Sequence, residues 1–459
     1  MIKKHKRTED KLNRQPIIDN LTLLIENTKE PLTMSINGGW GSGKTTFVQL
    51  WQENLEAKNI HSIYFSAWED DFSKEPLISI LGEINKYIEE KFEKPSMVKS
   101  KFKTVKDIGG KIITRALPAF AKSMTGGVLD LDKGIEDAMG ALTEQSVKEL
   151  IDRYSSDKKL TLQFKNSILE VLNLIDAEKP LVIFIDELDR CRPLYAIELL
   201  ERVKHLFGIE RLIFVLSIDK THLAESIKSQ YGNIDTDNYL RRFIDIEYTL
   251  PEPSLDKFCN YLYKNFYDFS NVFKEKNINK YTSNNDELAL LKYMVNVLNL
   301  SLREIEHVFI QLNLAFKTME KSTKDEYFRV YVLLITLKIK NNDLYTRLID
   351  KRLLVEEKEE FLSKFHKNTN DENEIYLFVK AIMFVCMLDF EEMHRLIKNQ
   401  KEKINSLTDI EEKNEQNRFV NIIKDLDSYS SYYVLNRATT KVVSQIDFLS
   451  QFNLDEQKA

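Results

Sequence analysis

The chain is poor in cysteine and lacks any long uninterrupted apolar run. Its 459 residues include only three cysteines, which lie far apart in the sequence, so we predict neither a disulfide framework nor a zinc site. No window reaches the roughly 18 apolar residues that a membrane span requires. The basic first residues run into Thr8-Glu9-Asp10 without an apolar segment, so no signal peptide is predicted. These absences favour a cytoplasmic protein.

The overall composition is that of a soluble globular enzyme. Hydrophobic residues make up 43% of the chain and charged residues 30%, which leaves enough apolar material for a sizeable core. The length corresponds to roughly two to three domains. The net charge of −6 gives the chain as a whole no attraction for nucleic acid or an anionic membrane.

Glycine is also scarce, yet four of the 13 glycines fall within eight consecutive residues. This stretch reads Gly38-Gly39-Trp40-Gly41-Ser42-Gly43-Lys44-Thr45 and fits the phosphate-loop pattern G-x-x-x-x-G-K-[ST]. Glycines allow the tight turns through which successive backbone N–H groups surround a phosphate. We expect Lys44 to reach the β- and γ-phosphates and Thr45 to bind Mg²⁺, with Thr46 beside them. A strand predicted at 31–37 and a helix predicted from Thr46 support an ATP or GTP site.

An apolar strand that ends in acid supplies the second half of this site. Residues Leu181 to Ile185 are all apolar, as expected of a parallel strand covered on both faces. Asp186 then stands at the carboxyl end of the strand, where open α/β sheets bind their ligands, and is the candidate Mg²⁺ partner. Glu187 is the candidate that orients or deprotonates the attacking water. The alternative, a buried strand with a solvated acidic end, weakens once a phosphate loop is present.

Further strands are predicted at 61–68, 211–217 and 244–250, and helices at 76–92, 194–206 and 220–230. Asp219 follows the 211–217 strand, where it could sense a γ-phosphate, cap the next helix, or do both. Arg241 and Arg242 are candidate γ-phosphate fingers, acting in cis or across a subunit interface. The alternative is that they are ordinary surface arginines.

An insertion is predicted at about 94–165, because roughly 90 residues separate two strands where one or two helices would be enough. Its first part combines basic residues with apolar residues at near-helical spacing; the basic ones are Lys99, Lys101, Lys103, Lys106, Lys111, Arg115 and Lys122. It could contact a membrane surface or nucleic acid. We favour a pair of helices packed on the main domain or on a neighbouring subunit, because Gly109-Gly110 and Pro118 are expected to interrupt a long membrane-lying helix.

The order of these motifs resembles the KAP family of P-loop NTPases over about residues 10–310. The resemblance rests on Asn37 to Thr45, Phe65-Ser-Ala-Trp68, Ile185 to Pro193, Phe214 to Asp219 and Tyr239 to Phe243. It implies an α/β P-loop NTPase core of the additional-strand type, in which an extra strand of a parallel sheet separates the phosphate-loop strand from the acidic strand. It also implies a helical insertion and an all-helical C-terminal region. The chain departs from the family pattern at Glu187, where a second Asp is common, and at Arg241 and Arg242, where an acid–lysine pair is frequent.

Residues beyond 254 are predicted to be helical, at 255–267, 286–298, 302–319, 324–341 and 374–397, with shorter pieces to about 452. We therefore predict an NTPase core at 1–253, a helical lid at 254–345, and a helical partner or oligomerisation region at 346–459. Arg303, at the start of a predicted lid helix, is the candidate lid sensor. Its alternative role is that of a solvated residue in a first turn.

Three functions remain open at the level of sequence. The resemblance favours a Mg²⁺-dependent ATPase that works as an oligomeric switch with an effector protein, in bacterial defence against phage or plasmids. The first alternative is an ATP-dependent loader or motor that contacts nucleic acid through the basic insertion. The second is a nucleotide-binding scaffold without turnover. No guanine-specific N-K-x-D string follows the core strands, and the preference for ATP over GTP is what the resemblance implies.

Overall fold

The computed structural model divides the chain into two compact units, Met1–Glu252 and Pro253–Ala459. It describes residues 9–73, 75–92, 96–124, 144–266, 286–318, 324–365, 370–387, 390–428 and 442–448. Two parts of the predicted insertion, 94–95 and 125–143, lie outside these residues, as do the predicted helix ends at 267 and 319. Within the described part of the chain, none of the helices is long and apolar enough to cross a membrane.

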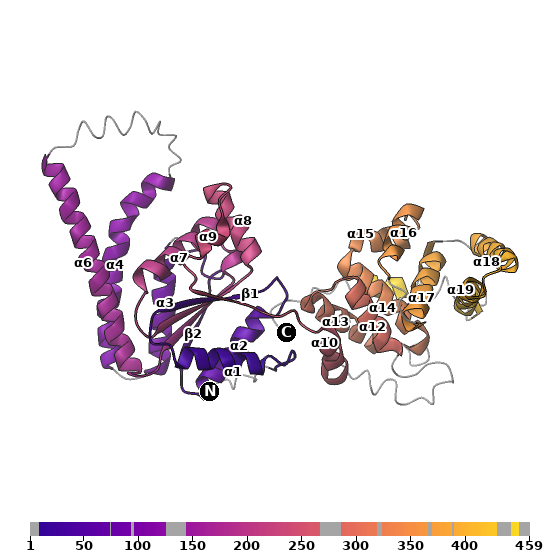
Figure 1. Ribbon diagram of the computed structural model, residues 1–459, viewed down its shortest axis with the longest axis horizontal. Helices are drawn as coiled ribbons and strands as arrows, with labels where there is room; N and C mark the ends of the chain where they lie inside the picture. The colour runs from indigo at the N-terminus through magenta and orange to yellow at the C-terminus, as the bar shows by residue number, and fades with distance from the viewer. Residues whose placement is uncertain are drawn as a thin grey trace. The chain divides into compact units, whose positions relative to one another are not determined.

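The first unit is built on a parallel sheet of five strands in the order β2-β3-β4-β1-β5 (Figure 1). The strands are β1 (Leu32–Asn37), β2 (His61–Ser66), β3 (Leu181–Asp186), β4 (Leu212–Ile218) and β5 (Ile246–Thr249). Strand β4 therefore separates the phosphate-loop strand β1 from the acidic strand β3, which confirms the predicted additional-strand order. Because all strands run the same way, the segments that follow β1, β2, β3 and β4 meet at one edge of the sheet.

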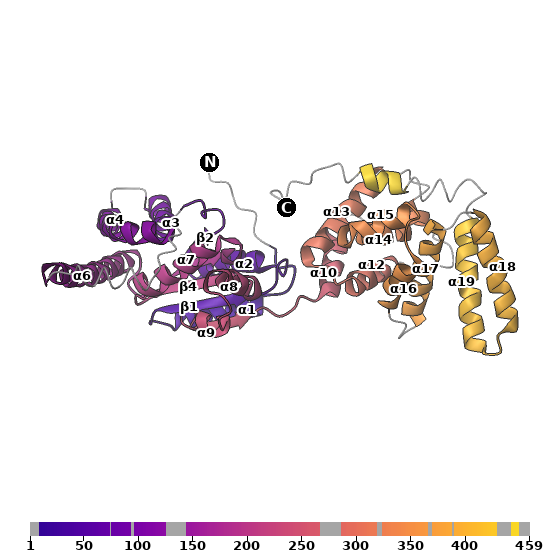
Figure 2. The same cartoon turned by 90° about the horizontal axis from the view of Figure 1, so that it is seen from above.

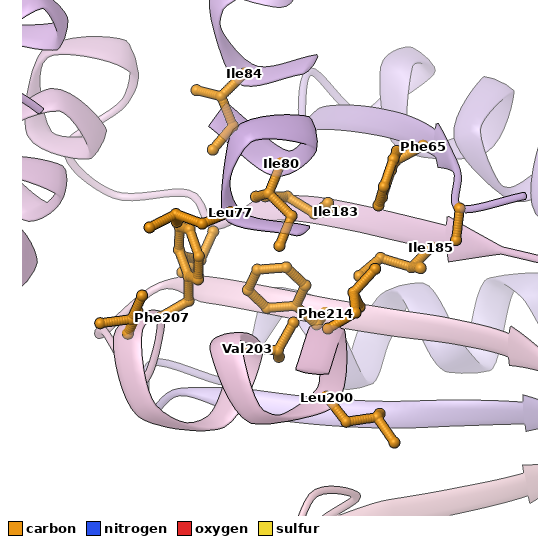
Figure 3. Packing of buried hydrophobic residues seen from close by; sticks show 14 of the residues in the cluster. Phe65, Leu77, Ile80, Ile84, Ile183, Ile185, Leu200, Val203, Phe207 and Phe214 are labelled. Atoms are coloured by element: carbon orange, nitrogen blue, oxygen red, sulfur yellow. The ribbon is translucent and has the colours of Figure 1, made fainter. Parts of the chain in front are cut away.

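Helices cover both faces of the sheet, so β3 and β4 are apolar except near their carboxyl ends. On one face, α1 (Gln15–Glu26) and α2 (Lys44–Ala57) enclose Trp51, which lies against Phe47 and Phe184. On the other face, α3 (Pro76–Lys91) and α7 (Pro193–Leu206) pack over β2, β3 and β4, and Figure 3 shows Phe214 in the middle of this cluster. Burial on this scale contributes about 1.5–3 kcal/mol for each large apolar side chain.

The insertion forms a helical hairpin of α4 (Met97–Met124) and α6 (Glu144–Ile175), which extends from the first unit (Figure 1). The expectation that Gly109-Gly110 and Pro118 interrupt a long helix is wrong, because α4 runs through all three. Gly109 instead provides close packing: a Cβ atom there would lie 2.8 Å from Leu81 Cδ1 and 3.6 Å from the ring of Phe164. The base of the hairpin thus packs on the main domain.

The remaining elements of the first unit are the 3-10 helix η1 (Leu188–Arg190), α8 (Lys220–Tyr231) and α9 (Thr236–Leu240). The second unit begins with α10 (Leu255–Tyr261), which continues as a π-helical turn, η2 (Leu262–Phe266). Its further helices, seen in Figure 2, are α12 (Asp286–Val297), α13 (Leu302–Thr318), α14 (Lys324–Lys340), α15 (Asn342–Ile349), α16 (Val355–Ser363), α17 (Asn370–Met387), α18 (Phe390–Ser406) and α19 (Ile410–Ser428). The prediction of one helix at 374–397 is wrong, since α17 ends at Met387 and α18 begins at Phe390. The separate lid at 254–345 stays a prediction.

Candidate nucleotide site

The phosphate loop connects β1 to α2 at the carboxyl edge of the sheet. Gly41 and Gly43 have φ values of 76° and 86°, a conformation that favours glycine. Gly38 is needed for a different reason, because a Cβ atom at this position would lie 2.8 Å from Ser42 Oγ. The glycines predicted from the pattern therefore have two physical roles, backbone conformation at Gly41 and Gly43 and close packing at Gly38.

The ammonium group of Lys44 lies across the loop from which it projects. Its Nζ atom donates to the carbonyl oxygens of Gly38 and Gly39 at 2.6 and 3.2 Å. Burial lowers the pKa of Lys44, whereas the carboxylates of Asp189, Asp219 and Asp186 act in the opposite direction. The ammonium group has three donors, so one of them is left for a phosphate group.

Thr45 and Asp186 come together as the sequence predicted. The hydroxyl of Thr45 donates to Asp186 Oδ2 at 2.8 Å, and Tyr64 donates to the same oxygen at 3.1 Å. Asp186 Oδ1 accepts from the backbone N–H of Glu187 at 3.0 Å. Burial, followed by the charge of Asp186, raises the pKa of Tyr64, so its phenol stays a donor.

The chemistry of these oxygen donors fits Mg²⁺. This ion takes one or two protein oxygens and completes its shell with water and substrate phosphates. Thr45 and Asp186 could hold it in that way. The described residues contain no group of three or more His, Cys, Asp or Glu side chains that could hold a metal alone.

Glu187 lies directly after Asp186 with a left-handed backbone conformation, φ 63°. Its carboxylate accepts a hydrogen bond from Ser66 Oγ at 3.1 Å and forms an ion pair with Arg190 at 2.8 Å. Ser66 reaches it because β2 and β3 pair in register, with Ser66 opposite Asp186. Glu187 is therefore oriented by two partners, and its two oxygens keep lone pairs that can accept a hydrogen bond from water.

Trp40 joins the phosphate loop to the ends of β3 and β4. Its indole Nε1 donates to Asp189 Oδ2 at 2.7 Å, and its ring stacks on His222 with 3.9 Å between centroids. The guanidinium of Arg190 lies 5.7 Å from the Trp40 ring. Asp189 is buried, and its Oδ1 accepts from the backbone N–H of Asp219 at 3.1 Å. One carboxylate thus connects the loop with the two strand ends.

Asp219 caps the N-terminus of α8, which is one of its two predicted roles. Its Oδ1 accepts from the backbone N–H groups of Thr221 and His222, and its Oδ2 lies 3.0 Å from His222 Nδ1. The carboxylate is almost fully buried. Asp219 belongs to the network around the phosphate loop, and γ-phosphate sensing stays a prediction.

The structure does not bring the predicted arginines to the phosphate loop. Arg241 and Arg242 are exposed in the turn after α9, and Arg241 contacts Asn238 at 3.4 Å. This turn precedes β5, which pairs with the middle of β1 from Met34 onward, whereas the phosphate loop follows the end of β1. Arg303 is exposed in the first turn of α13 in the second unit. Thr46 is exposed in the first turn of α2.

Several residues that the structure brings to the site were given no role in the sequence analysis. Ser66 and Tyr64 could have been suspected as polar residues on a strand beside the acidic one, and Asp189 and Arg190 as neighbours of Glu187. Arg14 gave no such signal. Its side chain is 4% exposed, and its Nη2 atom donates to the carbonyl oxygens of Ser42 and Pro251, each at 3.4 Å.

Comparison with known proteins agrees with this geometry. Residues 14–319 match the model of the KAP family P-loop domain. The phage T7 exclusion protein of Escherichia coli (strain K12) is 24% identical over 243 residues, which cover 51% of this chain and 31% of that protein. The chain thus spans under a third of the length of this relative.

Solved structures give only distant likenesses. C. elegans PCH-2 has 10% identity and a TM-score of 0.30, with 70% of this chain and 68% of that chain covered. The Aeropyrum pernix ORC2 protein with ADPNP and ADP has 13% identity and a TM-score of 0.33, with 91% and 95% covered. Likenesses this low carry no argument. The family match covers well over half of the chain, so the chain belongs to the KAP family of P-loop NTPases.

Proposed function

We propose that this chain is a Mg²⁺-dependent ATPase that acts as an oligomeric switch. Family membership implies nucleotide binding. The observation that carries the proposal is the Thr45–Asp186 hydrogen bond of 2.8 Å with Glu187 as the next residue. This arrangement supports the proposal, because two oxygen donors that could hold Mg²⁺ lie beside a carboxylate that could position water.

Each residue of the site then has a separate task. Backbone N–H groups of the loop and Lys44 bind the phosphates, and bound Mg²⁺ would neutralise charge on the phosphate oxygens. Tyr64 and the backbone N–H of Glu187 fix the two oxygens of Asp186. Glu187 accepts a proton from the attacking water through a lone pair that Ser66 and Arg190 leave open.

Nucleotide binding is tested by Lys44→Ala with Lys86→Ala as the matched control, since Lys86 is an exposed lysine on α3. The wild-type protein and Lys86→Ala should bind ADP and ATP with equal affinity. Lys44→Ala should lose at least about a hundredfold, because it removes a partly buried cation from the phosphates. ATP should bind more tightly than GTP. Unchanged affinity in Lys44→Ala contradicts the proposal.

We propose that Arg241 and Arg242 act on the site of a neighbouring subunit. Their exposure and their distance along the sheet from the phosphate loop support action across an interface rather than in cis. The double variant Arg241→Ala/Arg242→Ala should be inactive alone, as should Glu187→Gln. Mixing the two should restore turnover, because an intact site then meets intact arginines. Inactive mixtures that still assemble would contradict this assignment.

The proposed biological setting is defence against phage or plasmids together with an effector protein. The likeness to the phage T7 exclusion protein supports it. Direct handling of nucleic acid receives less support, because four basic residues of the hairpin have acidic or polar partners. The pairs are Lys99–Glu89, Lys101–Glu170, Lys106–Asn85 and Arg115–Asp157. Salt-dependent DNA binding that is lost on neutralising Lys99, Lys101, Lys103 and Lys106 would reverse this preference.

A further inference from the structure

Arg14 is a buried cation that the catalytic scheme does not use. Its side chain is 4% exposed, although arginine is almost never buried without a pairing partner. Nη2 donates to the carbonyl oxygens of Ser42, in the phosphate loop, and of Pro251, just after β5. Within the described residues, Nη1 of Arg14 is buried without a hydrogen-bond partner, and so is Oγ of Ser42. Buried polar atoms without hydrogen-bond partners cost free energy. A gain in folding stability therefore does not explain why Arg14 is buried here.

Hydrogen bonds to the backbone of Arg14 fix the position of this residue. The carboxylate of Asp10 accepts from the backbone N–H groups of Arg14 and Gln15, both at 2.9 Å. Pro16 then occupies the first turn of α1, where its lack of an N–H is harmless. The guanidinium is thus held by a local turn and by the start of a packed helix, so it can act on the loop as a rigid support.

The contact with Ser42 has a geometric consequence for the next residue. The Ser42–Gly43 peptide is trans, as no cis peptide occurs in the described chain, so its C=O and its N–H point in opposite directions. When Arg14 holds the carbonyl, the N–H of Gly43 faces away from Arg14. The same positive charge polarises the peptide and strengthens that N–H as a donor.

We propose that Arg14 is a positioning residue of the phosphate loop: it fixes the Ser42–Gly43 peptide so that the Gly43 N–H meets the β-phosphate, and it ties this peptide to the Pro251 carbonyl. Pro251 lies two residues before Pro253, with which the second unit begins. The geometry of the loop is therefore linked to the point at which the chain leaves the first unit. This inference rests on the nucleotide binding proposed above.

The test compares ADP with AMP, which lacks the β-phosphate, by calorimetric titration of the full chain. Arg14→Gln should weaken ADP binding about tenfold, because one charge-assisted contact behind the phosphate donor is lost. AMP binding should stay within about twofold, since the Gly43 N–H does not serve it. Arg14→Lys keeps the charge but replaces the rigid planar guanidinium with a compact ammonium on a flexible stem, and it should lie between wild type and Arg14→Gln. Arg115→Gln, which removes an exposed, paired arginine of the hairpin, is the control.

The outcomes separate the inference from the proposed function. Equal losses for ADP and AMP, or no loss for either, overturn the role of Arg14 while nucleotide binding by the wild type stands. A wild-type protein that binds no ADP overturns the nucleotide site itself, and the inference with it. If Arg14→Gln does not fold, Arg14→Lys decides alone: a selective loss of ADP affinity supports the role, and unchanged affinity refutes it.

Discussion

Replacing Asp189 with asparagine should loosen the phosphate loop and destabilise the first unit. The buried carboxylate of Asp189 uses both oxygens as acceptors, one for Trp40 Nε1 at 2.7 Å and one for the backbone N–H of Asp219 at 3.1 Å. Asparagine keeps one acceptor and turns an NH₂ group toward the other donor. The loss of one charge-assisted hydrogen bond, with a buried donor left unsatisfied, should cost about 1.5–3 kcal/mol in the free energy of unfolding.

Tryptophan fluorescence isolates this effect in a chain of two units. All three tryptophans, Trp40, Trp51 and Trp68, lie in the first unit, so urea denaturation followed by their emission reports that unit. Asp107→Asn, at an exposed position on α4, is the matched control and should change stability by less than about 0.5 kcal/mol. The reasoning is refuted if Asp189→Asn unfolds at the same urea concentration as this control.

Two further predictions concern packing and charge. Gly38→Ala should weaken ADP binding more than about tenfold, because its Cβ atom would lie 2.8 Å from Ser42 Oγ. Gly39→Ala is the control: its Cβ atom meets no atom within 4 Å, so the affinity should change less than about twofold. Equal ADP affinities of the two variants in a titration would contradict this prediction. Burial, with the nearby charge of Glu75, raises the pKa of Glu198 from 4.5 to about 7. The contribution of Glu198 to the stability of the first unit is therefore present below pH 4.5 and is lost as the pH rises through about 7. Glu198→Gln should therefore raise the stability of the first unit at pH 8 by about 1 kcal/mol, after allowance for solvent screening, and leave it unchanged near pH 4.5. Urea denaturation at pH 8 and at pH 4.5 measures the two effects. An equal change in stability at both pH values would contradict the prediction.

Local chemistry explains why the sequence predicted the core strands and the phosphate loop. A glycine-rich turn before a lysine, and an apolar strand that ends in Asp186, are each visible within about ten consecutive residues. The order of strands β1, β4 and β3 was not deduced from the residues and came from the family resemblance. The structure then confirmed it.

The supports of the site were missed because their contacts join distant parts of the chain. Ser66 meets Glu187 across 121 positions, Trp40 meets Asp189 across 149, and Arg14 meets Pro251 across 237. No local pattern encodes such pairs. Local rules also misled at Pro118, since α4 continues through a residue type that usually breaks or kinks a helix.

Glu187→Gln provides the most direct test of the switch mechanism. ATP hydrolysis should be measured for the purified wild type and for this variant, with molecular mass followed by light scattering with and without ATP. The account predicts turnover by the wild type, and ATP binding without turnover by the variant, which ATP should hold in an assembled state. Normal hydrolysis by Glu187→Gln would contradict the assignment of the catalytic carboxylate, and a mass that does not respond to ATP would contradict the switch.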